Sequence, residues 1–195
     1  MTHLVVGPEG SGTTLFSKIL RDHPDTGWVY HCSFPTPADD AHAYAPDGKA
    51  VLVKWTERFG PGAIAMPGRR RKPRWPAMCF ADINGIDPDG RMTLWVCCRD
   101  RSCTTKSQLR RRIYGERSCE EQSVFGRDVE LQRLYIEEQL GRREGPVVWV
   151  SYETLVQWSD HYLRRKFAEA GLDPNRFPYD NLDLADQNAK WIRDP

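Results

Sequence analysis

The sequence of 195 residues lacks an excess of either charge and has no long hydrophobic run. Lys and Arg total 28 against 27 Asp and Glu, which leaves a net charge of +1. This balance provides no field that would draw the chain to nucleic acid or a membrane surface. No segment approaches the roughly 18 apolar residues of a membrane-spanning helix, and the N-terminal residues carry no basic region typical of a signal peptide. We therefore expect a soluble, cytoplasmic protein without nucleic-acid or membrane partners.

The six cysteines lack the spacing of a metal or redox site. None of them forms a C-x-x-C pair, and no histidine stands at zinc-ligand spacing. A domain of this size does not need disulfides to fold. We predict reduced thiols, several of them buried, and no bound metal.

Strand patterns alternate with helix patterns along the chain. The hydrophobic spacing predicts strands over residues 3–6, 49–55, 91–98 and 145–155, and helices over 13–23, 103–115, 127–142 and 162–172. This alternation favours an α/β fold with a mainly parallel sheet and helices on both faces. The length suits a single domain over residues 1–195, with a loop-rich excursion at about 60–90.

A glycine-rich loop follows the first predicted strand. Residues 7–14 read G-P-E-G-S-G-T-T, which fits the phosphate-loop frame G-x-x-x-x-G-K-[ST] except that Thr13 replaces the lysine. In such a loop, backbone N–H groups converge on an anion and the following helix dipole adds to the attraction. A phosphate or sulfate group suits that chemistry. The candidate anion-binding residues are Gly7, Glu9, Gly10, Ser11, Gly12, Thr13 and Thr14.

Three stretches resemble the sulfotransferases that use 3′-phosphoadenosine 5′-phosphosulfate (PAPS), in that family's order. "GPEGSGTTL" looks like the family's phosphosulfate loop, which lacks the lysine. "VCCRDRSCTTKSQ" places Arg99 and Ser107 in a pattern similar to the family's R-x7-S, and "VVWVSYETLV" resembles a later strand and helix of bacterial and carbohydrate sulfotransferases. The resemblance implies a three-layer P-loop-like fold and transfer of a sulfuryl group from PAPS to a hydroxyl or amine.

The same resemblance assigns roles to particular residues. Arg99 and Ser107 would grip the 3′-phosphate of PAPS, since an arginine fork and a helical hydroxyl can bind a phosphate from two sides. Lys190, near the C-terminus, would help to cover the cofactor. PAPS would be a co-substrate without a metal, and the acceptor would be a small molecule or carbohydrate.

The sequence departs from the family at two functional positions. Many members carry a cation where this chain has Gly10, and that cation neutralises charge as the sulfuryl group leaves. We predict Lys54 as its replacement, with Arg58 as the second choice. The family's catalytic histidine is not reproduced, so Glu57 is the predicted general base and His31 the competing one.

Other functions stay open at this level. A P-loop small-molecule kinase would need Mg²⁺ and a cation on the transferred phosphate, and Thr13 is a poor substitute for that cation. A non-catalytic nucleotide-binding relative is the third possibility. The basic cluster at 69–74, beside Trp75, is either solvated or draws anions toward the cleft.

Overall fold

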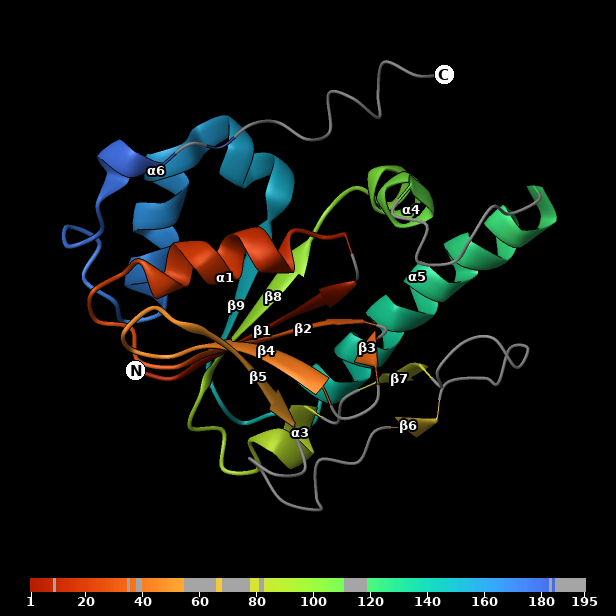
Figure 1. Ribbon diagram of the computed structural model, residues 1–195, viewed down its shortest axis with the longest axis horizontal. Coiled ribbons are helices and arrows are strands. Elements are labelled where there is room, and N and C mark those ends of the chain that lie inside the picture. The colour runs from red at the N-terminus through yellow and green to blue at the C-terminus, as the bar shows by residue number, and fades with distance from the viewer. Residues whose placement is uncertain are drawn as a thin grey trace.

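The fold is described from a computed structural model that covers residues 1–8, 10–34, 36–37, 40–54, 66–67, 78–80, 83–110, 119–182 and 184. One strand and one helix open the chain, several consecutive strands follow, and the part from residue 93 onward combines strands with helices (Figure 1). In chain order the elements are β1 (His3–Pro8), α1 (Thr13–Arg21), β2 (Val29–Phe34), β3 (Thr36–Pro37), β4 (Asp40–Tyr44), β5 (Ala50–Lys54), β6 (Met66–Pro67), β7 (Met78–Phe80), α3 (Ile83–Ile86), β8 (Thr93–Cys98), α4 (Arg101–Arg110), α5 (Cys119–Leu140), β9 (Val147–Ser151), α6 (Tyr152–Glu169) and the 3-10 turn η1 (Tyr179–Asn181).

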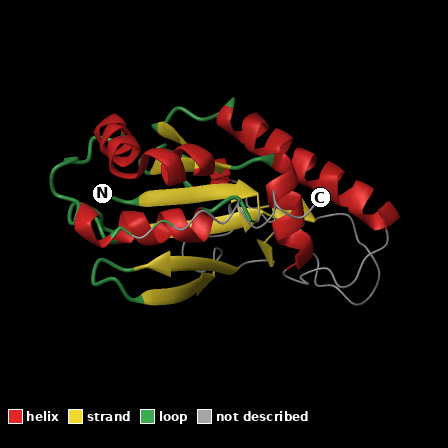
Figure 2. Ribbon diagram, turned by 90° about the horizontal axis from the view of Figure 1, so that it is seen from above, coloured by secondary structure: helices red, strands yellow, loops and turns green. Residues whose placement is uncertain are grey.

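Six strands form the main sheet in the order β5-β4-β2-β1-β8-β9. The four strands β2, β1, β8 and β9 run parallel to one another, whereas β4 pairs antiparallel with both β2 and β5. Figure 2 shows the resulting β4–β5 hairpin at one edge of the sheet. A separate sheet of three short strands has the order β3-β7-β6.

Side chains of β1 alternate between two hydrophobic cores. Leu4 and Val6 pack in one core with residues from α5 and α3, and Val5 packs in the other with residues from α1 and α6. A strand buried on both faces must be apolar at successive positions, which explains the uninterrupted run at the start of the chain. The strand therefore holds the loop that follows it on a rigid support.

The sequence predicted the fold class and missed two strands of the main sheet, together with the three short strands of the second sheet. The α/β class and the mostly parallel sheet are confirmed, and β1, β5, β8 and β9 lie within or close to predicted strands. The strand predicted over 49–55 is β5, which lies at the edge of the sheet and runs antiparallel to β4. Neither β2 nor β4 was predicted, because His31, Ser33 and His42 interrupt their apolar patterns. The region 60–90 contains β6, β7 and α3, and much of the remainder lies outside the described residues.

No helix within the described ranges combines the length and the hydrophobicity that a membrane span requires.

Candidate functional site

The chain reverses its direction of travel across the sheet between β1 and β8. It passes from β1 through α1 to β2 on one side, and it returns later to β8 and then β9 on the other side. In open α/β sheets, ligands bind outside the carboxyl ends of the strands at such a switch point. Two connections meet there: the loop between β1 and α1, and the segment that joins β8 to α4.

The β1–α1 loop turns sharply and ends in an uncapped helix. Gly10 and Gly12 have φ values of 83° and 96°, a left-handed conformation that favours glycine. Gly12 is also the N-cap of α1, and no side chain caps the helix there. Because the first N–H groups of a helix have no intrahelical acceptor, the start of α1 can donate to an anion.

Gly7 is required by close packing at the end of β1. A Cβ atom at this position would lie 2.4 Å from Ser11 Oγ and 2.6 Å from the Cys97 carbonyl oxygen. The second of these is backbone of the adjacent strand β8 and cannot move aside cheaply. The glycine therefore lets the loop fold tightly against β8.

Ser11 places a hydroxyl inside the loop. Its side chain is buried, with 1% of the residue exposed, and Oγ has no hydrogen-bond partner among the described residues. The close approach to Gly7 shows that Oγ is directed into the turn. A buried hydroxyl usually has a partner, so this one is available to a group bound in the loop.

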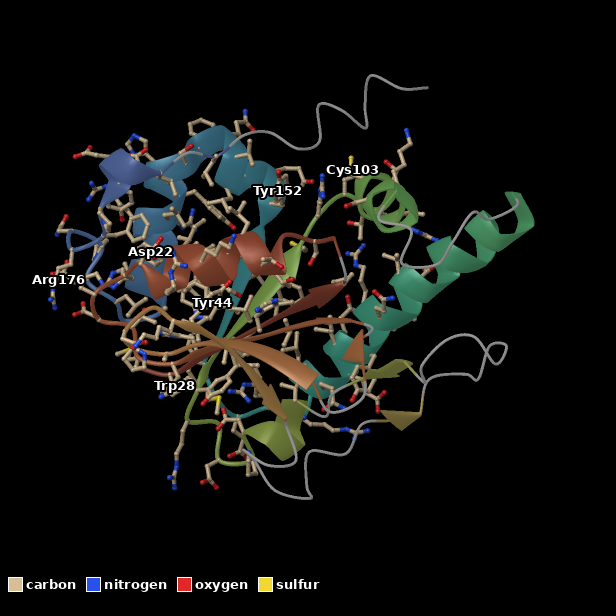
Figure 3. All side chains as sticks on the ribbon, in the orientation of Figure 1. Asp22, Trp28, Tyr44, Cys103, Tyr152 and Arg176 are labelled. Atoms are coloured by element: carbon tan, nitrogen blue, oxygen red, sulfur yellow. The ribbon has the colours of Figure 1, made fainter. Side chains whose placement is uncertain are left out.

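Arg99 reaches the loop from the carboxyl end of β8. Its Nη1 atom donates to the Gly10 carbonyl oxygen at 2.9 Å, and its guanidinium carbon lies 4.5 Å from the ring centre of Tyr152. Tyr152 is buried where α6 begins (Figure 3), and its Cδ2 would lie 2.9 Å from a Cβ on Gly12. The arginine and the tyrosine thus support the loop at its two left-handed glycines.

Ser107 meets the same loop from α4. A Cβ on Gly10 would lie 3.3 Å from both Cβ and Oγ of Ser107, so the helix packs directly on this glycine. Asp100 caps α4 by accepting from the Ser102 hydroxyl and the Cys103 amide, and these bonds lower the pKa of its carboxyl group. Arg99 and Ser107, which the sequence predicted to bind a phosphate together, therefore both lie at Gly10 of the loop.

A small pocket lies beside this loop, under α4 and α5. Its cavity volume is about 20 Å³, room for roughly one water molecule. The floor is apolar, with Val96, Val129 and Ile136, and the pocket also reaches Pro8 and Arg99. Three exposed side chains, Arg133, Glu137 and Trp149, also line the pocket.

The cysteines of the site are free and buried or partly buried. Cys97 and Cys98 end β8, and Cys103 lies in the first turn of α4. Burial raises the pKa of the Cys97 and Cys98 thiols, which keeps them protonated at neutral pH. They act as packing groups, in agreement with the prediction of reduced, buried thiols.

The structure gathers part of the predicted site and separates the rest. Gly7, Gly10, Ser11, Gly12, Thr13 and Thr14 form the loop and the first turn of α1, beside Arg99 and Ser107. Glu9, Glu57, Arg58 and Lys190 lie outside the described residues. The assignments made to these four stay predictions.

Lys54 ends β5, far from the loop. The strand pairing aligns Lys54 with Asp40 and Gly7 with Ser33, so Lys54 stands level with Gly7. Three strand spacings separate them, about 14 Å of sheet, which is farther than a lysine side chain reaches. The placement of its backbone weighs against Lys54 as the cation of the loop.

His31, the competing base, is a core residue. It is buried in β2, level with Val5, and its ring stacks on Tyr44 at 6.4 Å between centroids. A base for an incoming substrate must be reachable from the carboxyl ends of the strands. His31 is buried within the sheet, two residues before the level of Gly7, so its position suits packing in the core.

Sequence reasoning missed Tyr152, Arg133, Glu137 and Trp149 as residues of the site. Tyr152 follows the parallel strand β9 directly, and the rule that carboxyl ends of parallel strands meet could have identified it. Arg133 and Glu137 are one helical turn apart in a long polar helix, and nothing in the sequence distinguishes them from solvated charges.

Comparisons with protein-family models, curated proteins and solved structures found no match to this chain. Among the described residues there is also no cluster of three or more side chains that could hold a metal ion.

Proposed function

We propose that this protein binds a phosphorylated adenosine nucleotide in the β1–α1 loop and transfers a sulfuryl group from PAPS to a hydroxyl or amine. One observation carries the proposal: Gly10 contacts both Arg99 and Ser107 at the switch point of the sheet. This arrangement combines backbone donors, a guanidinium and a hydroxyl within one small region. Such a set suits an anion with several oxygens.

We also propose that the α/β fold is P-loop-like and has three layers. A strand, a tight glycine loop and a helix occur in that order at the centre of a mostly parallel sheet. Helical residues pack in the cores on both faces of β1. These features support the resemblance to sulfotransferases.

The proposed reaction is an in-line displacement at sulfur. The acceptor oxygen or nitrogen uses its lone pair to form a bond to sulfur, and the bond from sulfur to the bridging oxygen breaks. The electron pair of that bond stays on the 5′-phosphate of the departing 3′,5′-adenosine bisphosphate (PAP). The acceptor's proton passes to a carboxylate or to solvent. Positioning and charge stabilisation supply most of the acceleration in such a step.

The pocket beside the loop would receive the reacting hydroxyl or amine of the acceptor. It borders Pro8 and Arg99, and its apolar floor can hold only a small group in its present form. Trp149, which is 44% exposed, offers an aromatic face at the pocket. Glu137 is the described carboxylate that lines this pocket, and it joins Glu57 as a candidate base.

A kinase is less well supported. Thr13 replaces the lysine that would hold the transferred phosphate, and Asp100, the carboxylate that follows β8, is engaged as the cap of α4. A nucleotide-binding protein without catalysis would show the same binding and no turnover.

Thermal melting with PAP, PAPS, ATP and ATP–Mg²⁺ tests the proposal. We expect PAP at 100 times its dissociation constant to stabilise the protein by about 2.7 kcal/mol relative to the unliganded protein. ATP–Mg²⁺ should stabilise it less. A shift with ATP–Mg²⁺ and none with millimolar PAP would refute a sulfotransferase. If PAP binds, a screen of sugars, phenols and amines with labelled PAPS separates an enzyme from a binding protein.

A further inference from the structure

We propose that Arg99 supplies the cation that the loop lacks at Gly10. This inference rests on the proposed function, because it assigns Arg99 to the 5′ end of the nucleotide. The resemblance to sulfotransferases implies instead that Arg99 binds the 3′-phosphate. The two assignments predict that loss of Arg99 weakens the binding of different nucleotides, those with a 5′-phosphate in one case and those with a 3′-phosphate in the other.

The guanidinium of Arg99 lies beside Gly10, the position at which many sulfotransferase loops similar to this one carry a cation. Nη1 is 2.9 Å from the carbonyl oxygen of Gly10 itself. A guanidinium has five N–H donors in a planar fork, so a bond to this carbonyl is compatible with further bonds to anion oxygens. An arginine from the neighbouring strand can therefore replace a lysine within the loop.

Tyr152 fixes the orientation of this cation. The guanidinium carbon lies 4.5 Å from the centre of the tyrosine ring, and the ring is buried against Gly12. Stacking on an aromatic face holds the planar fork in one direction. The charge is also partly buried, where its attraction for an anion is stronger than in water.

The inside of the loop provides a second, independent observation that points to an anion. Ser11 Oγ is buried, directed toward Gly7 and without a hydrogen-bond partner among the described residues. The uncapped start of α1 lies next to it. The hydroxyl, the helix N–H groups and Arg99 thus lie along one short loop, and such a set of donors suits a phosphate or phosphosulfate.

Binding of two adenosine monophosphates distinguishes the two assignments. Adenosine 5′-monophosphate carries only the 5′-phosphate, and adenosine 3′-monophosphate carries only the 3′-phosphate. We expect Arg99→Gln to weaken binding of the 5′-monophosphate by about 10- to 100-fold, the range for a hydrogen bond to a charged group. Its affinity for the 3′-monophosphate should stay within about twofold of wild type. Titration calorimetry measures both.

Two further variants control this experiment. Arg101, two residues after Arg99, is an exposed arginine that pairs with Glu130. Arg101→Gln should leave the affinities for both monophosphates unchanged. Arg99→Lys keeps the charge and loses the fork, so it should bind the 5′-monophosphate with intermediate affinity. It also serves if Arg99→Gln does not fold.

The outcomes separate this inference from the proposed function. Selective loss of the 3′-monophosphate in the Arg99 variants would overturn the inference while PAP binding by the wild type still supports the function. Arg99-dependent binding of inorganic pyrophosphate, without binding of either nucleotide, would support the inference and count against the function. If wild type binds none of these ligands, both are wrong.

Discussion

Single residues show how tightly the loop and its supports are built. Gly7 accommodates the backbone of β8, and Arg99 and Tyr152 hold the two left-handed glycines. At the opposite end of β1, His3 is fully buried and its Nδ1 accepts from Trp95 Nε1 at 3.2 Å. These contacts fix both ends of the strand that carries the loop.

His3 makes the stability of the protein depend on pH. Burial, the positive N-terminus and His23 lower its pKa from 6.5 to about 3, so the folded protein keeps this imidazole neutral. The unfolded chain binds the proton below about pH 6.5, and stability therefore falls as the pH drops from 6.5 toward 3. Between pH 7 and pH 5 the loss due to His3 should be roughly 2 kcal/mol.

Urea unfolding at pH 7 and pH 5 measures this loss. His23 contributes in the same direction, since burial lowers its pKa as well. His3→Asn keeps an acceptor for Trp95 and removes the titrating group, so it should have a shallower pH dependence than wild type. An unchanged slope in this variant would show that His3 is not the source.

At the scale of elements, a buried ion pair joins two turns at the amino end of the sheet. Arg143, after α5, lies 2.6 Å from Asp87, after α3, and the two side chains are 1% and 5% exposed. Asp87 also accepts from the amides of Arg91 and Met92, which lead into β8. The pair therefore connects the residues just before β8 to the segment that leads into β9.

Removal of this arginine should be costly. Arg143→Ala leaves a buried carboxylate without its cation, and we expect a loss of about 3–5 kcal/mol in the free energy of unfolding. The neighbouring Arg142→Ala removes an exposed pair with Glu138 and should cost at most about 1 kcal/mol. Chemical denaturation of both variants measures the difference. Equal losses would mean that the Arg143 pair contributes no more than a surface pair.

At the scale of the whole molecule, the sequence predicted what depends on local pattern. The apolar runs of β1, β8 and β9 and the glycines of the loop are continuous signals, so the α/β class and the loop could be predicted. Tertiary pairing determines the rest. The hairpin β4–β5 moves Lys54 to the sheet edge, and the approach of α6 brings Tyr152 onto Gly12. No local spacing encodes such contacts between distant segments.

Hydrogen exchange with and without saturating PAP tests most directly whether the nucleotide occupies the switch point between β1 and β8. Slower amide exchange is expected in peptides that cover residues 7–16 and 99–107, because bound phosphate accepts from the loop and steadies the packing of Arg99 and Ser107 on Gly10. Peptides from β4 and β5, at the far edge of the sheet, should exchange as before. Unchanged exchange at residues 7–16 in a protein saturated with PAP would contradict the proposed site.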